Sequence, residues 1–498
     1  MNGSLNNRLY NRVTMKTTVC RLYFSLLTIV LLSTTQVVKA NSVAKEMDNF
    51  VSSFHQLKQF NGNVLVAKQG NVIFEKSYGH ANFEWEIKNT AETKFRIGSI
   101  TKQFTALLIL QLVQQGKIQL DAPLSTYLPD YRQDIGNKIT IRQILNHTSG
   151  LDNYTRAKDF RSHYSRNPYT VNEFITLLCS EDLLFEPGSQ FSYSNSGYFI
   201  LGAVIEAVTQ KRYQDVLQER ILTPLNMHDT GYDSHTKIIS QRASGYSNNL
   251  DGYKNADYLD MSIPYAAGSM YSTARDLLKW DQALYTNTLL NEKLKSHMYK
   301  VSEQRNYALG WEVSQLKVNQ YGKPLTQTQH GGGIDGFNAF ISRIIEDQLV
   351  IIILNNTGGA PLTPMTKGLT DIFYGTPSEL ATENMDSLLY RALQLGGISE
   401  LKRTYNQLNE QQVPLRERSI NYLGYELMAL KQLDAAIAVF ELNATKYPES
   451  ANTFDSLGEA YLKAKQYTLA LQSYQQALKL NPTSESAQQA ITQLKAIK

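Results

Sequence analysis

The 498-residue chain contains only two cysteines, Cys20 and Cys179. Cys20 lies in an N-terminal segment that we expect to be removed, so a single cysteine would remain in the mature chain. One cysteine cannot form an internal disulfide, so stability must come from packing of the core. Cys179 follows two leucines, which favours a buried, apolar role for its thiol.

A basic surface is also lacking. The formal net charge is +4, but residues 1–40 hold five basic residues and no acidic one, which leaves −1 for the rest of the chain. Proteins that bind nucleic acid or anionic membranes do so through clusters of Lys and Arg. We therefore predict no nucleic-acid partner.

The chain has an apolar run near its start, Leu22–Leu32, but this run is short for a membrane span. Basic residues precede it, and Val38-Lys39-Ala40 resembles a small-residue cleavage site. We predict a signal peptide over residues 1–40, export to the periplasm or beyond the cell, and no stable membrane anchor after cleavage. An uncleaved signal anchor is the alternative. The segment that begins at Met15 is a complete signal by itself, so Met1 and Met15 are both candidate starts.

Several catalytic signatures are missing as well. The sequence has no G-x-S-x-G elbow, which argues against the nucleophile turn of α/β-hydrolases. Its eight histidines are scattered, with no H-E-x-x-H motif or cysteine-rich pair for zinc. It also lacks a P-loop and a dinucleotide fingerprint. We predict neither a metal nor an organic cofactor.

The order of strand and helix patterns predicts how the first part of the chain is organised. Residues 63–79 read as a hairpin with a turn at Gln69-Gly70-Asn71, and two strands follow much later, at Ala339–Ile344 and Leu349–Leu354. Between them, residues 100–115 and 198–222 have helical character. This order predicts one α+β lobe built from both ends of the region, with a helical lobe inserted.

The C-terminal part repeats with a period of 34 residues. The repeated positions are three leucines and three prolines, at Leu389, Leu423, Leu457, Pro414, Pro448 and Pro482. With its Leu-Gly pair, central Ala and aromatic residue, the pattern resembles the tetratricopeptide repeat. We predict a first domain at 41–380 and helical repeats at 385–498, with a degenerate first copy and a polar final helix at 485–498. A plain helical bundle with accidental spacing is the alternative.

Ser99 and Lys102 lie three residues apart in F-R-I-G-S-I-T-K, at the expected start of a helix. Side chains at i and i+3 share a helix face, so the two can meet. A serine hydroxyl needs a neighbouring base to act as a nucleophile. Lysine supplies one when burial or a nearby cation lowers its pKa.

Two later segments offer partners for this pair. Tyr193 and Asn195 lie in Q-F-S-Y-S-N-S-G-Y, on a predicted loop between helices. A phenolate beside a lysine can act as a general base, and an asparagine offers a donor and an acceptor to a substrate amide. His330 begins H-G-G-G, where the glycines let the backbone approach a ligand closely and a backbone N–H can stabilise an oxyanion. For His330 we consider binding a substrate carboxylate or passing a proton.

The ordered set S-x-x-K, Y-x-N and a late basic residue with glycines resembles the penicillin-recognising serine hydrolases. This family includes class C β-lactamases, D-alanyl-D-alanine carboxypeptidases, esterases and aminopeptidases. Further stretches over residues 45–375 look similar, namely Ile144–Leu151, Pro224–Met227, Ala267–Leu277 and Leu309–Trp311. The resemblance implies an α/β (α+β) β-lactamase/transpeptidase-like fold, with an antiparallel sheet flanked by helices and a helical lobe, followed by the all-α repeats.

The resemblance also implies roles for the site residues. Ser99 would be the acylated nucleophile, and Lys102 and Tyr193 would share the proton transfers. Asn195, His330, Gly332 and Gly333 would bind the substrate. The oxyanion hole would use the backbone N–H groups of Ser99 and Gly333. His147 lies within Ile144–Leu151. Because the sequence has no G-x-S-x-G serine with which this histidine could form a triad, we interpret it as structural.

One departure from the family pattern narrows the range of substrates that we expect. H-G-G-G replaces K-T-G, so a lysine charge and a threonine hydroxyl are both missing. We therefore expect an exported hydrolase of peptides, amides or esters, of D,D-peptidase or esterase type, with weak β-lactam hydrolysis and slow acylation by penicillins. The alternative is a catalytically weak scaffold whose repeats bind a protein partner.

Overall fold

The computed structural model describes residues 42–318 and 322–497. The predicted signal peptide, residues 1–40, lies outside the described residues. The chain divides into two compact units, one of residues up to 247 together with 255–381, and one of residues 248–254 together with 382 to the C-terminus. Among the described helices, none has the length and apolar character needed to cross a membrane.

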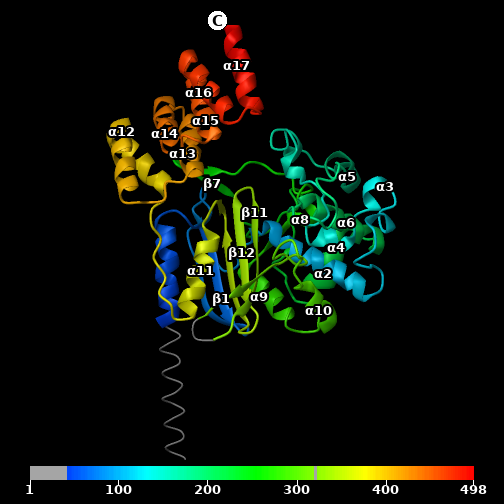
Figure 1. The fold of residues 1–498 in the computed structure, drawn as a ribbon. Helices are drawn as coiled ribbons and strands as arrows, with labels where there is room; N and C mark the ends of the chain where they lie inside the picture. The colour runs from blue at the N-terminus through cyan, green and yellow to red at the C-terminus, as the bar shows by residue number, and fades with distance from the viewer. Residues whose placement is uncertain (1–41, 319–321, 498) are drawn as a thin grey trace, which may run out of the picture. The chain divides into compact units, whose positions relative to one another are not determined.

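A six-stranded antiparallel sheet forms the centre of the first unit (Figure 1). Its order is β10-β11-β12-β13-β1-β2. The strands are β1 (Gly62–Lys68), β2 (Asn71–Ser77), β10 (Glu312–Leu316), β11 (Leu325–Ile334), β12 (Phe337–Ile344) and β13 (Leu349–Asn355). Val64 of β1 pairs with Ile353 of β13, so strands from the two ends of the unit lie side by side. This confirms the predicted lobe built from both ends.

The predicted hairpin is formed by β1 and β2, joined at Gln69 and Gly70. Both residues have positive φ angles, 52° and 75°. Two-residue hairpin turns with positive φ at both positions match the right-handed twist of the strands they join. The turn therefore sets the register between β1 and the edge strand β2.

Both faces of the sheet are covered by helices. Along β13, Leu349, Ile351 and Ile353 pack with the helix over residues 42–56 and with α11 (Leu362–Phe373). The alternate residues of the same strand enter a second core with α2 (Thr101–Gln114) and α9 (Ala274–Ala283). Because successive side chains point to opposite faces, a strand covered on both sides is continuously apolar. This explains the run L-V-I-I-I-L, and Figure 1 shows the helices on the two faces.

The inserted lobe is mainly helical. Its helices are α3 (Gln133–Gly136), α4 (Ile141–Leu145), α5 (Val171–Leu178), α6 (Asn195–Thr209), α7 (Tyr213–Leu217), α8 (Tyr265–Gly268) and α10 (Glu292–Met298). The predicted single helix at 198–222 is wrong, because Gln210 has a φ of 55° and ends α6 in the left-handed conformation. The chain resumes as α7 and a π-helical turn at Gln218–Leu222. Cys179 is buried in the core of this lobe, as expected.

Short strands complete the first unit around these layers. They are β3 (His80–Asn82), β4 (Ile87–Lys88), β5 (Phe95–Arg96), β6 (Gly231–Tyr232), β9 (Met270–Ser272) and β14 (Thr357–Gly358). Two more short strands, β7 (Tyr246–Asn249) and β8 (Gly252–Asn255), include residues of the segment 248–254, which belongs to the second unit. Among the short strands of the first unit, β5 pairs with β9, and β9 pairs with β6. This small sheet holds the segment that leads directly into Ser99.

A buried ion pair joins a helix to the central sheet. Arg343 of β12 donates from Nε to Asp281 of α9 at 2.5 Å, and the two side chains are 1% and 0% exposed. A second nitrogen of Arg343 donates to the Tyr299 hydroxyl at 2.7 Å. The guanidinium also lies over the rings of Tyr285 and Trp311. The pair therefore fixes α9 on the face that also carries α2.

The second unit consists of paired helices with the predicted period. They are α12 (Met385–Glu410), α13 (Glu417–Ala429), α14 (Leu433–Lys446), α15 (Ala451–Lys463), α16 (Tyr467–Leu480) and α17 (Glu485–Ile497). A Cβ on Gly424 would lie 2.5 Å from the Phe440 ring, and one on Gly458 would lie 3.1 Å from the Tyr474 ring. The glycines are needed because the aromatic ring of the second helix sits directly on the first. This packing confirms the expected role of the Leu-Gly pair.

Candidate active site

Ser99 lies in a 3₁₀ turn, Gly98–Ile100, that leads directly into α2. Gly98 has a φ of 49°, and a Cβ there would approach the backbone nitrogen of Gly333 to 2.9 Å. Glycine is therefore required before the serine, for both its conformation and its contact with β11. The prediction that Ser99 begins a helix is confirmed by this geometry.

Lys102 is fully buried in the first turn of α2. Its Nζ donates to three oxygens, Ser99 Oγ at 2.9 Å, Asn195 Oδ1 at 2.8 Å and the Ala267 carbonyl at 2.9 Å. Burial lowers the pKa of Lys102 well below its ordinary value, while the three acceptors favour the charged form. The amine is thus held at hydrogen-bonding distance from the serine, with its proton affinity reduced.

Tyr193 lies on the loop between α5 and α6, as predicted. Lys102 Nζ sits 4.9 Å from the centre of its ring. Burial raises the pKa of Tyr193, and a hydrogen bond with the Ser99 side chain acts in the opposite direction. A phenol with a raised pKa keeps its proton at neutral pH, so the resting group is a proton donor rather than the phenolate considered above.

Asn195 is the first residue of α6, whose start is fixed by Ser194. The Ser194 hydroxyl caps the helix by accepting from the Gly197 N–H at 3.1 Å. Asn195 Oδ1 accepts from Lys102, and its Nδ2 donates to Asn153 Oδ1 at 3.2 Å. Asn195 therefore connects the Lys102 amine to Asn153 through the oxygen and nitrogen of its side-chain amide.

His330 is buried on β11 and has partners on both ring nitrogens. Nδ1 donates to the Gly331 carbonyl at 2.6 Å, which leaves Nε2 to accept from the Tyr307 hydroxyl at 2.9 Å. Burial, together with the nearby Lys102, lowers the pKa of His330 to about 4. A neutral imidazole with both nitrogens engaged is a weak ligand for a carboxylate, so substrate binding by His330 stays a prediction.

Two residues at the site, Tyr307 and His147, were not identified from the sequence as part of it. Tyr307, the partner of His330, immediately precedes the Ala308–Trp311 segment and carried no signal of its own. His147 has a φ of 61°, and its ring centre lies 4.2 Å from that of Tyr193. Its Nδ1 accepts from the Ser194 N–H at 3.2 Å. The histidine interpreted as structural thus supports the loop that presents Tyr193.

The glycines of β11 bring that strand against the serine. A Cβ on Gly332 would lie 1.9 Å from the Ile97 carbonyl oxygen and 3.1 Å from the backbone nitrogen of Ser99. Gly333 is the next residue and contacts Gly98. The two N–H groups predicted for the oxyanion hole, those of Ser99 and Gly333, therefore come from backbone segments in direct contact.

We expect Gly332→Ala to lower the rate of Ser99 acylation by about 100-fold, because the added methyl group must push β11 away from the serine turn. The rate of labelling by an active-site-directed probe measures this effect. Gly331→Ala is the matched control, since a Cβ there meets only the Phe340 ring at 3.4 Å. Equal rates for the two variants would show that close approach of β11 is unimportant.

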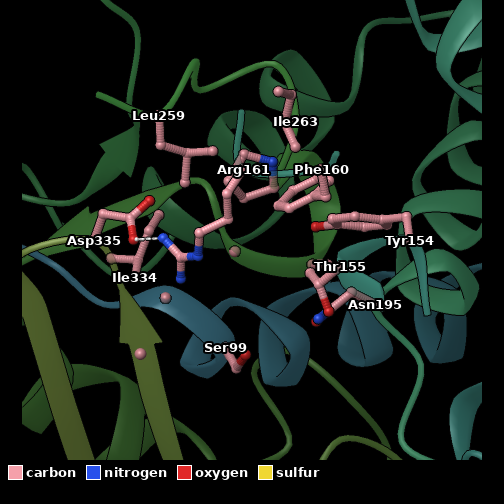
Figure 2. Close-up of a pocket in the computed structure, with 15 residues that line it drawn as sticks. Ser99, Tyr154, Thr155, Phe160, Arg161, Asn195, Leu259, Ile263, Ile334 and Asp335 are labelled. Atoms are coloured by element: carbon pink, nitrogen blue, oxygen red, sulfur yellow. Dashed lines mark hydrogen bonds and ion pairs between the residues drawn. The ribbon is translucent and has the colours of Figure 1, made fainter. Parts of the chain in front are cut away.

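A pocket of about 130 Å³ adjoins Ser99 (Figure 2). Backbone of β11 forms one wall through Gly333, and Asn195 lies on another side. Apolar and aromatic side chains complete the lining, namely Tyr154, Phe160, Leu259, Ile263 and Ile334. A small organic acyl group can therefore lie next to the serine, in contact with apolar side chains.

Known protein families match both units of the chain. The family model described as Beta-lactamase matches residues 47–369, and the model described as Tetratricopeptide repeat matches residues 456–484. The chain is similar to the teichoic acid D-alanine hydrolase of Staphylococcus aureus, with 26% identity over 317 residues, covering 63% of this chain and 74% of that protein.

Two solved structures resemble the first unit. The D-amino acid amidase from Ochrobactrum anthropi SV3 superposes with a TM-score of 0.56 and 25% identity, over 68% of this chain and 96% of the amidase. A penicillin binding protein from Bacillus halodurans gives a TM-score of 0.56 and 25% identity, over 66% and 97% of the two chains. The similarity spans the lobe that carries Ser99 and the strands that close around it.

Proposed function

Since the chain belongs to the β-lactamase family of serine hydrolases, we propose that it cleaves peptide, amide or ester bonds through an acyl-enzyme formed on Ser99. The observation that carries this proposal is the 2.9 Å contact between Lys102 Nζ and Ser99 Oγ, made by a buried lysine whose pKa is lowered. A surface lysine would be protonated at neutral pH and could not accept the serine proton.

The proposed reaction has two halves. Ser99 Oγ attacks the substrate carbonyl as its proton passes to neutral Lys102, and the N–H groups of Ser99 and Gly333 stabilise the resulting oxyanion. Tyr193 donates its proton to the leaving group as the carbonyl–leaving-group bond breaks, and recovers a proton from Lys102. Water then attacks the ester with the same groups acting in reverse, which releases the acid and restores Ser99.

For the substrate we propose esters, amides or peptides of D-amino acids. Support comes from the names of two relatives, a teichoic acid D-alanine hydrolase and a D-amino acid amidase. Such substrates belong to the cell envelope, which suits the export predicted from residues 1–40 to the periplasm or beyond. Slow acylation by penicillins, with weak β-lactam hydrolysis, remains part of the proposal.

Labelling with a fluorophosphonate probe, followed by peptide mass spectrometry, tests the central step. We expect one adduct, on Ser99, and a slower adduct on the same residue with benzylpenicillin. Prior heat denaturation of the protein is the control for non-specific labelling. Folded protein that takes up no probe at Ser99 would contradict the proposal.

The pH dependence of labelling reports on Lys102. Because burial lowers its pKa, the neutral form accumulates as pH rises through that lowered value rather than through 10.5. We expect the labelling rate to increase with pH and to level off well below pH 10.5, the ordinary lysine pKa. His330, with a pKa of about 4, stays neutral throughout that range and adds no second step to the pH profile of labelling. A rate that still climbs steeply through the ordinary lysine pKa would argue against Lys102 as the base.

We also propose that the repeats at 385–498 bind a protein partner, a role favoured by the Tetratricopeptide repeat match. If the protein is mainly a scaffold, Ser99→Ala will retain its cellular function while deletion of 385–498 will abolish it. If it is mainly an enzyme, Ser99→Ala will abolish its cellular function. Comparing the two variants in complementation of a deletion strain separates these outcomes.

A further inference from the structure

The pocket beside Ser99 has two charged side chains in its lining, Arg161 and Asp335. Arg161 Nη1 donates to Asp335 Oδ1 at 2.7 Å. Figure 2 shows the arginine extending across the pocket toward the aspartate, with Ser99 on the pocket floor in that view. Asp335 is therefore already paired with a cationic group, the guanidinium of Arg161.

The two partners differ in how firmly they are held. Asp335 is 18% exposed and lies in the turn between β11 and β12, two residues after Gly333. Next to it, Gly336 has a φ of 77° and is packed against Gly245, which fixes this turn. Arg161 is 73% exposed, lies in an irregular loop, and makes a single-point contact rather than a bidentate one. An ion pair with such an exposed partner contributes little stability, so Arg161 can be displaced while Asp335 stays in place.

The position of the pocket indicates which part of a substrate it receives. A leaving group must lie beside the group that protonates it, and the hydroxyl of Tyr193 is the donor in the proposed reaction. Tyr193, Lys102 and His330 are not among the residues that line this pocket. The leaving group therefore lies toward Tyr193, and the pocket is left for the acyl group.

We propose that the pocket selects acyl groups that carry a protonated amine, which takes the place of Arg161 at Asp335. This inference rests on the proposed function, because it describes the acyl half of the same reaction. Phe160, Leu259 and Ile263 would contact the aliphatic part of the acyl group. A carboxylate-bearing acyl group would instead meet the Asp335 charge, or would have to bind Arg161.

Matched donors with one leaving group test the selection. D-alanine p-nitroanilide and D-lactic acid p-nitroanilide differ only in an amine against a hydroxyl of similar size. Succinic acid mono-p-nitroanilide carries a carboxylate in its acyl group. We expect kcat/KM to be at least about tenfold higher for the amine than for the hydroxyl donor, and lowest for the carboxylate. If the anilides are cleaved too slowly, protection of Ser99 from the fluorophosphonate tests the same preference, and D-alaninamide should protect at a lower concentration than D-lactamide.

Three variants locate the effect. Asp335→Asn should reduce the amine-to-hydroxyl ratio to near one, whereas Arg161→Gln should raise it, because the substrate no longer competes with the arginine. Arg212→Gln is the matched control, since Arg212 forms an equally short 2.7 Å pair with Asp215, is 70% exposed and lies outside this pocket. Its ratio should equal that of the wild type.

The outcomes that overturn the inference are distinct from failure of the proposed function. A wild-type ratio near one, preference for the carboxylate donor, or an Asp335→Asn variant that slows both donors equally would each overturn amine selection. In all three cases Ser99 would still be labelled. Absence of any Ser99 adduct would instead refute the hydrolase itself.

Discussion

Replacing Ser99 by alanine is expected to lower kcat/KM by about 10⁴-fold and to abolish the probe adduct. The substitution removes the nucleophile while leaving Lys102 its bonds to Asn195 and the Ala267 carbonyl. The variant should therefore fold normally, and its circular dichroism spectrum and thermal midpoint should match those of the wild type. Assay of ester hydrolysis with each purified protein measures the loss.

Ser296→Ala is the matched control for this variant. Ser296 lies on the exposed face of α10, where its hydroxyl bonds only the Lys293 carbonyl. Its removal should leave both labelling and hydrolysis within the error of the assay. If Ser99→Ala retained a tenth or more of the wild-type activity, the acyl-enzyme mechanism would be wrong.

Replacing Arg343 by methionine is expected to lower the free energy of unfolding by about 3–5 kcal/mol. The change leaves the Asp281 carboxylate buried, without its partner, between α9 and the sheet. Burial raises the pKa of Asp281 even with Arg343 beside it, so the carboxylate charge becomes still more costly when the arginine is removed. Urea denaturation followed by tryptophan fluorescence measures the loss, since all three tryptophans, Trp85, Trp280 and Trp311, lie in the first unit.

The double variant Arg343→Met, Asp281→Leu should recover much of this stability, because no unpaired charge then remains. Arg275→Met provides the contrast, as its 2.8 Å pair with Glu75 is exposed and should be worth at most about 1 kcal/mol. A loss for Arg343→Met no larger than that for Arg275→Met would show that the buried pair does not hold α9 in place.

Much of the fold could be predicted because its signals are local. The hairpin at 63–79 depends on a glycine turn between two β-rich runs, and the repeats depend on a fixed spacing. The Ser99–Lys102 contact depends only on helix periodicity. The break at Gln210 was missed because it depends on one residue adopting the left-handed conformation, which polar residues do without a distinctive pattern.

The partners that surround the site could not be predicted in the same way. Tyr307 meets His330 only because β11 returns past the loop before β10, and Arg161 and Asp335 are 174 residues apart in the sequence. Neither contact has a spacing or periodicity that a single sequence reveals. The motifs could therefore indicate the candidate catalytic residues, whereas the fold was needed to show which charged side chains line the pocket beside Ser99.

The pairing of β1 with β13 has a consequence for the life of the chain before it folds. β1 cannot pair with β13 until residues 349–355 have been synthesised. The central sheet is therefore incomplete in any shorter nascent chain. Contacts between residues so distant in sequence form slowly, because a long loop must close first. We expect the emerging polypeptide to remain unfolded for most of its synthesis. This delay would suit the export that we predict from residues 1–40, because a chain crosses a membrane unfolded and would acquire its active site afterwards.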